Sequence, residues 1–171
     1  MGGHLHEPPG NATDPKAALL DYLDFYRSVV AAKLDGLTDE QLDRPQFVST
    51  WTPRQLIKHL VYMERRWLRW GFMAEQIPDP AGDCDAGDHW QTGPADSREA
   101  LVAALAEGGS RTRSIAEHAE LTDRGAVGGR FTGEGPPPTL LWILLHVLQE
   151  YARHAGHLDV AREELDGTVG E

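Results

Sequence analysis

Apolar residues recur at steps of three and four in four long segments of the chain, which is the spacing of one face of an α-helix. The first segment follows Thr13 or Asp14 as a helix cap, has Pro15 at the first helical position and closes at Gly36. The second opens with a Thr-Pro-Arg-Gln run at residues 52–55, which combines a cap, a proline and a capping-box glutamine. The apolar positions of these two segments are Leu19, Leu23, Tyr26, Val30, Leu34 and Leu37, then Leu56, Leu60, Met63, Trp67 and Trp70.

The other two helices are expected in the second half of the chain. The third is predicted to begin near Asp96 or Ser97, with Glu99 placed to close a capping box. The fourth is predicted to begin at Thr139 and to run to about Leu165. The apolar positions of these helices are Leu101, Leu105, Thr112, Ile115 and Ala119, then Leu141, Leu144, Leu148, Tyr151, Ala155 and Leu158.

Four amphipathic helices, without a convincing strand pattern or an internal repeat, predict an all-α fold that is a four-helix bundle. We expect residues 1–13 to be a flexible N-terminal tail and residues 14–171 to form a single domain. A short further turn is expected at residues 38–41, which have capping-box spacing. All the connections are long enough for crossovers, so helix spacing leaves the topology open. Residues 71–96 form a long acidic loop, and loops of this length are usually functional or disordered.

Composition narrows the classes of partner. The chain has 171 residues, with 27 acidic against 16 basic side chains and a formal net charge of −11. This balance argues against nucleic acid and against anionic membrane surfaces, because both are bound by clustered Lys and Arg. The longest apolar run, residues 140–145, is too short to span a membrane, and residues 1–10 lack the apolar core of a signal peptide. A single cysteine, Cys84, excludes an internal disulfide and a multi-cysteine zinc site, and it fits a reducing cytoplasmic location.

The eight histidines are the unusual feature of so acidic a chain. Four residues of the last helix are spaced four, four and three and fall within a sector of about 80°: His146, Glu150, His154 and His157. This sector is either a solvated face or a metal site, because imidazole and carboxylate at positions i and i+4 project side by side. His59 lies on the flank of the apolar stripe of the second helix, where it is either a core histidine or a further ligand.

Imidazole and carboxylate ligands suit zinc, nickel, iron or manganese better than calcium or magnesium. From the spacing alone, two or three of the four residues on the last helix, together with His59, would hold such an ion. Three protein ligands leave one coordination position open, which is the arrangement of catalytic rather than structural sites. An open zinc site lowers the pKa of bound water or ionises a bound thiol.

Other residues were assigned supporting roles or none. Trp142 and Trp90 are candidate pocket walls, whereas Trp67 and Trp70 lie on the apolar stripe and are predicted to be core. Arg153 lies beside the ligand sector, where it either recognises an anionic group or is solvated. The carboxylates that flank the only cysteine should raise its thiol pKa, which disfavours a nucleophilic role. The histidines without an assigned role are His4, His6, His89 and His118.

Residues 140–146 and 150–159 of the last helix, with residues 58–67 and 20–27, carry a resemblance to a known family. The chain resembles the DinB-like metalloprotein superfamily, and within it the actinobacterial branch associated with mycothiol-dependent enzymes. The resemblance covers residues 16–171. It implies a bundle with up-down-down-up connectivity and a divalent metal between the second and fourth helices.

The resemblance implies that His59, Glu150 and His154 are the metal ligands. The metal is expected to be zinc, with nickel, iron or manganese as alternatives. Bundles of this family often pair, so a homodimer is also expected. The residues that would orient the ligands or contact substrate are His146, His157, Arg153 and Trp142.

The resemblance also implies a reaction. Metal-bound mycothiol, or a similar low-molecular-weight thiol, would attack an electrophilic small molecule in a detoxification reaction. The isomerase members of the branch carry an additional C-terminal domain, and this chain ends at Glu171 without it, which favours S-transfer over isomerisation. The alternatives are a non-catalytic metal-binding bundle whose role is binding, and a mycothiol-dependent isomerase that lacks the extra C-terminal domain.

Overall fold

The structure is a computed structural model that describes residues 5–170. Within this range the β-structure is limited to isolated bridges, so the predicted all-α fold is confirmed. His4, to which the sequence assigned no role, lies outside the described residues. The helices are α1 (Pro15–Ala32), α2 (Asp39–Leu42), α3 (Pro53–Arg65) with its π-helical continuation η1 (Arg66–Phe72), α4 (Arg98–Glu117) and α5 (Leu140–Asp166).

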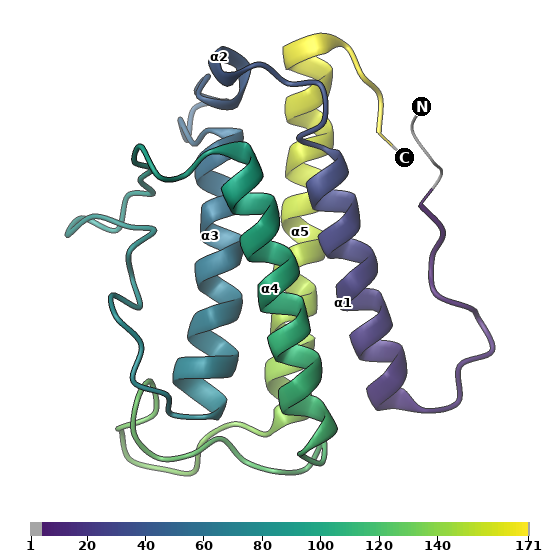
Figure 1. Ribbon diagram of the computed structural model, residues 1–171, viewed down its shortest axis with the longest axis vertical. Coiled ribbons are helices and arrows are strands. Elements are labelled where there is room, and N and C mark those ends of the chain that lie inside the picture. The colour runs from purple at the N-terminus through teal and green to yellow at the C-terminus, as the bar shows by residue number, and fades with distance from the viewer. Residues whose placement is uncertain (1–4, 171) are drawn as a thin grey trace.

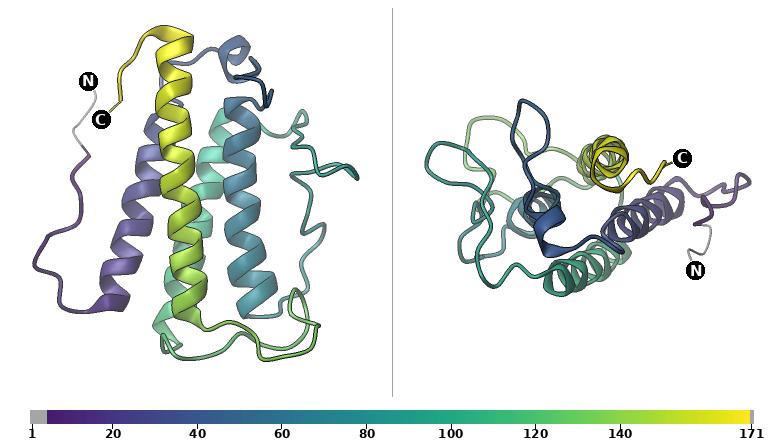
Figure 2. Two further views of the ribbon diagram at one scale, coloured as in Figure 1. Left: turned by 180° about the vertical axis from the view of Figure 1, so that it is seen from behind. Right: turned by 90° about the horizontal axis from the view of Figure 1, so that it is seen from above.

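The four long helices surround one core (Figures 1 and 2). Figure 1 shows α1 and α5 running upward and α3 and α4 running downward, which is the up-down-down-up order that the family resemblance implies. Helix α1 contacts α4 and α5, and α3 contacts the same two helices on the other side. Because α3 and α4 are consecutive and run in the same direction, the connection at residues 73–97 must return along the length of a 20-residue helix, about 30 Å.

Side-chain caps fix most of the helix boundaries that the sequence predicts. Asp14 accepts hydrogen bonds from the first turn of α1, and Thr38 and Thr52 form complete capping boxes at α2 and α3. Ser97 caps α4 without a capping box, so the role predicted for Glu99 is wrong: its carboxylate accepts hydrogen bonds from the neighbouring Arg98 instead.

The ends of α1 and α5 differ in how closely they follow the prediction. Helix α5 begins after its cap Thr139 and ends at Gly167, whose φ of 75° is the left-handed conformation typical of glycine. Helix α1 ends at Ala32, four residues earlier than predicted, and the chain then turns until Gly36, where φ is 79°. The turn places Leu34 and Leu37 in the core although neither is helical.

The π-helical segment η1 changes which side chains of the second long helix are buried. A π-turn contains one more residue than an α-turn, so the residues after it rotate relative to the apolar stripe. Leu68 and Phe72 are buried, and Trp67 is partly buried and packs against the core, as predicted. Trp70 is partly buried without belonging to the core, so its prediction as a core residue is wrong. Leu141 is a second exception, since it is 39% exposed near the start of α5.

Glu64 joins all four long helices in the core. Its carboxylate accepts hydrogen bonds from Arg27 on α1, from the Thr112 hydroxyl on α4 and from the Tyr151 hydroxyl on α5 at 2.7 Å. Burial alone would lower the pKa of Arg27, but the charge of Glu64 and its hydrogen bond raise it above its ordinary value. Gly109 lets the arginine approach α4, because a Cβ there would lie 3.0 Å from its Nη1.

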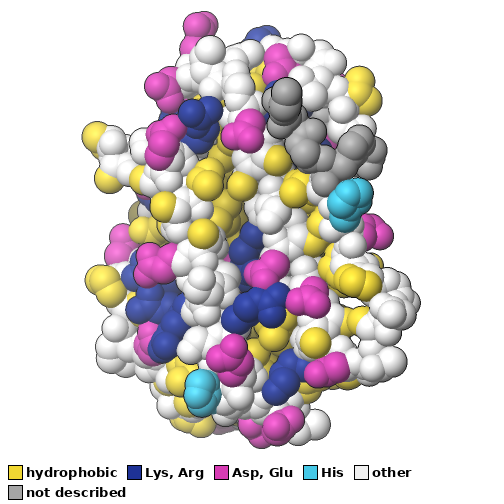
Figure 3. All heavy atoms as spheres, turned by 45° about the vertical axis from the view of Figure 1, so that its right-hand side comes forward, with side chains coloured by type: hydrophobic (Ala, Val, Ile, Leu, Met, Phe, Trp, Pro, Cys, Tyr) yellow, Lys and Arg dark blue, Asp and Glu magenta, His cyan; other side chains and the backbone are white. Residues whose placement is uncertain are grey.

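Basic and acidic side chains are interspersed on the surface. On the side shown in Figure 3 they lie next to one another, with apolar side chains visible between them. Arg113, for example, pairs with Asp21 and Asp24 across α4 and α1. Among residues 5–170, no helix is both long and apolar enough to cross a membrane.

Candidate metal centre

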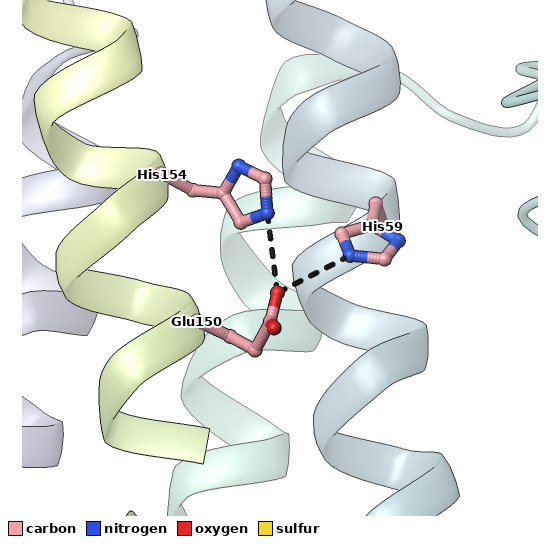
Figure 4. Close-up of side chains that lie close together, drawn as sticks. All are labelled: His59, Glu150 and His154. Carbon is pink, nitrogen blue, oxygen red and sulfur yellow. Dashed lines mark ion pairs between the residues drawn. The ribbon is translucent and has the colours of Figure 1, made fainter. Parts of the chain in front are cut away.

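His59, Glu150 and His154 converge where α3 and α5 pack together. Glu150 and His154 lie one turn apart on α5, and His59 faces them from α3 (Figure 4). The Nε2 atoms of His154 and His59 lie 3.3 Å and 3.9 Å from Oε2 of Glu150. One ligand atom from each residue lies within 4.8 Å of the other two, and this is the one such cluster within residues 5–170. The structure therefore brings together the three ligands that the family resemblance implies.

Asp83, from the long acidic loop, orients His59. Its Oδ2 lies 3.1 Å from Nδ1 of His59, and its carboxylate also accepts hydrogen bonds from Arg66. Asp83 is fully buried, and burial would raise its pKa, but the hydrogen bonds from His59 and Arg66 keep the pKa below the ordinary value. An ionised carboxylate on Nδ1 holds the proton there and leaves the Nε2 lone pair facing Glu150. The sequence around Asp83 contains no signal that predicts this contact with His59.

His154 is neutral at pH 7. It is 7% exposed, and burial, followed by the repulsion from His59 that arises when both imidazoles are protonated, lowers its pKa to about 4. Its lone pair is therefore free for a metal over the whole neutral range. His157, one turn further along α5, is exposed, and its Nδ1 lies 3.3 Å from Nδ1 of His154. His157 thus lies beside a candidate ligand rather than within the cluster.

Aromatic rings enclose the cluster on two sides. Trp90 stacks on His59, with ring centroids 4.3 Å apart and an interplanar angle of 20°. On the other side Trp142 stacks on His146 at 5.3 Å, and Trp67 approaches the same imidazole to 4.5 Å. Trp90, which the sequence suggests as a pocket wall, lines a pocket, and Trp142 lies beside His146. Trp67 joins them because its ring, which packs against the core, also contacts His146.

His146 lies at the edge of the cluster. Its Nε2 is 3.9 Å from Oε1 of Glu150. Its pKa is lowered, first by burial and then by the positive charges of Arg130 and Arg153, although Glu150 acts in the opposite direction. Arg153 is exposed, and within residues 5–170 its side chain is in no ion pair. Of the candidate substrate-contacting residues, His146 and Trp142 thus border the cluster beside Glu150, whereas His157 lies beside His154.

The donor set fits a divalent first-row metal. Two imidazole nitrogens and one carboxylate oxygen are the ligand types that zinc and its neighbours prefer, and one imidazole is held in position by a buried carboxylate. The cluster contains no fourth protein ligand within residues 5–170. A bound ion would therefore keep a coordination position for a substrate.

Replacing Asp83 with Asn should weaken metal binding by about 10–100-fold, because the neutral amide no longer fixes the tautomer and orientation of His59. The measurement is a zinc competition titration on the folded variant. Asp88→Asn is the matched control, since this carboxylate lies in the same loop and is exposed. Equal affinity in the Asp83 variant and the wild type would show that the contact does not orient the ligand.

Cys84 should react slowly with alkylating agents in the native protein. Burial, together with the nearby Asp83 and Asp88, raises its pKa to about 11, as the flanking carboxylates predict. Compared with a thiol of the ordinary pKa of 9.0, the thiolate fraction at pH 7.5 is about a hundredfold smaller. The rate of iodoacetamide labelling, compared in buffer and in urea, measures this. Labelling as fast in the native as in the unfolded chain would contradict it.

The fold and the cluster define a class of protein: a four-helix bundle with a candidate divalent-metal centre of two histidines and one glutamate between facing helices. Comparison with protein families matches residues 18–167 to "Mycothiol-S-transferase". The chain therefore belongs to the mycothiol S-transferase family, a DinB-like family, as the resemblance of the sequence predicts. Membership supports mycothiol as a substrate and thiol transfer as the general activity.

A solved structure gives independent support for the fold. A protein described as "conserved protein of locus from Enterococcus faecalis" has a TM-score of 0.59 to this chain and 17% sequence identity. The alignment covers 92% of this chain and all of that one. Identity this low supports the shared fold alone. Among curated proteins, none matches the chain.

Proposed function

We propose that the protein is a metal-dependent mycothiol S-transferase that joins the thiol to an electrophilic small molecule, as in detoxification. The observation that carries the proposal is the convergence of His59, Glu150 and His154, with one ligand atom of each within 4.8 Å of the others. Zinc is the proposed ion, and nickel, iron or manganese are the alternatives that the same donors accept. A divalent ion held there supplies a Lewis acid that lowers the pKa of a thiol.

The residues around the cluster have separate tasks in this reaction. Asp83 keeps the Nε2 of His59 available, and the low pKa of His154 keeps that imidazole unprotonated. His157 lies 3.3 Å from the Nδ1 of His154, so its task is to orient that imidazole, and the thiol proton passes to solvent. The thiolate sulfur then forms a bond to the electrophilic carbon, and the leaving group departs with the electron pair of the bond that breaks.

A pocket beside the cluster suits the hydroxyl-rich part of mycothiol. It has a volume of about 440 Å³ and is lined by Ser49, Thr50, Gln55, Asp88 and His89 and by two tryptophans, Trp51 and Trp90. The ring of Trp90 forms one wall and contacts His59 with its face, so the pocket lies one side chain from the cluster. Hydroxyl and amide groups bind sugar hydroxyls, and indole faces pack against sugar rings. We infer that the thiol enters from this side.

A closed, purely structural metal site is the alternative from another class. It would need a fourth protein ligand, for which His146 and His157 are the neighbouring histidines. His146 contacts Glu150 but is not among the residues whose ligand atoms all lie within 4.8 Å of one another, and His157 contacts the Nδ1 side of His154, away from the Nε2 that faces Glu150. Neither contact favours a closed site.

The direct test is turnover of mycothiol with monobromobimane by the zinc-loaded protein. We expect formation of the thioether well above the uncatalysed rate, and loss of the acceleration when zinc is removed by a chelator and the protein stays folded. Cysteine in place of mycothiol measures how much the carbohydrate contributes. A fully zinc-loaded, folded protein without acceleration would overturn the proposal in favour of a binding role.

A further inference from the structure

Arg130 is an arginine without an acidic partner at the edge of the candidate metal centre. Eight arginines within residues 5–170 form ion pairs with carboxylates, but Arg130 forms neither an ion pair nor a side-chain hydrogen bond among these residues. It is nevertheless half-buried. Burial of a charge without a counter-charge is unfavourable. An arginine without an acidic partner is therefore unusual in this chain, because acidic side chains are in excess and the net charge is −11.

The backbone and an aromatic ring hold Arg130 in place. Its N–H donates to the carbonyl oxygen of Trp70 at 3.2 Å, which ties the loop between α4 and α5 to η1. Its guanidinium carbon lies 4.2 Å from the ring centroid of Trp67, a cation–π contact. The N–H groups of a guanidinium stacked in this way point outward in its plane, and here they remain free to bind an acceptor.

The stacked arginine continues the aromatic wall of the metal centre. Trp67 contacts both Trp142 and His146, and His146 is the neighbour of the candidate ligand Glu150. We define the Trp67 wall as these three rings, Trp67, Trp142 and His146, together with Arg130. Trp142 is 49% exposed, so the wall is open to a ligand.

The charges around this wall favour an anion. Arg130 and Arg153 both act on His146 as positive charges, and Arg66 acts on Arg130 in the same way. The acidic groups nearby are already engaged, since Asp83 pairs with Arg66 and Glu150 faces the two candidate histidine ligands. A bound metal would add further positive charge. The wall is therefore electropositive although the chain as a whole is acidic.

We propose that the Trp67 wall binds the electrophile, and that this electrophile carries a carboxylate or a comparable anion on a planar carbon skeleton. Arg130 binds the anion through its free N–H groups, and the stacked Trp142 and His146 face the skeleton. The proposal rests on the proposed transferase function. It assigns the two sides of the centre to different substrates: the hydroxyl-lined pocket to the thiol and the Trp67 wall to an anionic electrophile.

A matched pair of electrophiles tests the charge preference. 4-(Bromomethyl)benzoate and 4-(bromomethyl)benzamide react at the same carbon: the thiolate forms a C–S bond, and bromide leaves with the electron pair. We expect the ratio of kcat/KM for the benzoate to that for the benzamide to fall at least about tenfold in Arg130→Met, since a hydrogen-bonded charge pair is lost. Arg130→Lys should retain part of the ratio.

Arg124→Met is the control, because Arg124 lies in the same loop and donates to the carbonyl of Pro137 without reaching the wall. It should keep the wild-type ratio. If Arg130→Met slows both electrophiles equally, Arg130 only fixes the loop, and the proposal is overturned. An unchanged ratio in Arg130→Met and Arg130→Lys overturns it as well.

A binding experiment separates this proposal from the transferase function. The unreactive 4-methylbenzoate is titrated into the zinc-loaded protein without thiol, and tryptophan fluorescence reports occupation of the wall. We expect the dissociation constant to rise at least about tenfold in Arg130→Met. Arginine-dependent binding without turnover of any electrophile would support the anion site and contradict thiol transfer. Turnover of both electrophiles without any charge preference would support thiol transfer and contradict the anion site.

Discussion

Replacing His154 with Ala is expected to lower mycothiol transfer to monobromobimane by at least about 100-fold. The variant loses one of the three converging ligands, and the remaining pair cannot hold the ion in the same geometry. The imidazole is buried and neutral, so no solvent-exposed side chain replaces its lone pair. Initial rates at saturating mycothiol, with equal zinc in all samples, measure the effect.

His118→Ala is the matched control for this variant. His118 is an exposed histidine at the end of α4, where its ring contacts the carbonyl of Ser114, and it lies outside the metal cluster. The His118→Ala variant should transfer mycothiol to monobromobimane at the wild-type rate. A folded His154→Ala protein with the wild-type rate would show that the reaction does not use the cluster.

Replacing Glu64 with Leu is expected to lower the free energy of unfolding by about 3–5 kcal/mol. The change leaves Arg27 with only the half-exposed Asp24 as its acidic partner, and it removes the acceptor of Thr112 and Tyr151. Urea unfolding at a fixed zinc concentration measures the loss, because metal binding itself contributes to stability. A loss below about 1 kcal/mol would contradict the role given to Glu64.

Two further variants show whether the loss comes from the buried charge. Glu107→Leu replaces an exposed glutamate of α4 and should change stability by less than about 0.5 kcal/mol. Combining Arg27→Met with Glu64→Leu should recover part of the loss, because no unpaired charge then remains in the core.

The sequence predicts those features of the fold that depend on residues close together in the chain, such as helix starts and ends. Thr52 and Thr139 mark helix starts and Gly167 marks an end, because capping depends on residues within one turn. The π-turn in η1 has no such local signal, and for that reason the prediction that Trp70 is a core residue failed. Residue spacing also left the order of the helices open, since long connections permit several arrangements.

The buried Glu64 illustrates a second limit of the sequence. A glutamate within an amphipathic helix resembles any solvated position, and its burial becomes intelligible only with three partners from three other helices. Gly109 is related to it, because a glycine inside a helix is unfavourable and is explained here by the approach of Arg27.

The candidate site could be anticipated in part. The four-residue spacing of Glu150 and His154, together with His59, follows from helical periodicity and the family resemblance, and these three side chains converge. Asp83 and Arg130 could not be anticipated, since each comes from a loop whose path depends on the whole fold. Loop contacts thus determine the orientation of one ligand and the charge of the aromatic wall.

Metal content of the purified protein, measured by native mass spectrometry after dialysis against zinc and then buffer, tests the proposed centre. We expect one zinc ion per chain in the wild type. We expect none in Glu150→Gln, which replaces the carboxylate that faces both histidines. A folded wild-type chain without zinc, or a Glu150→Gln variant that retains it fully, would contradict the assignment of His59, Glu150 and His154 as the metal ligands.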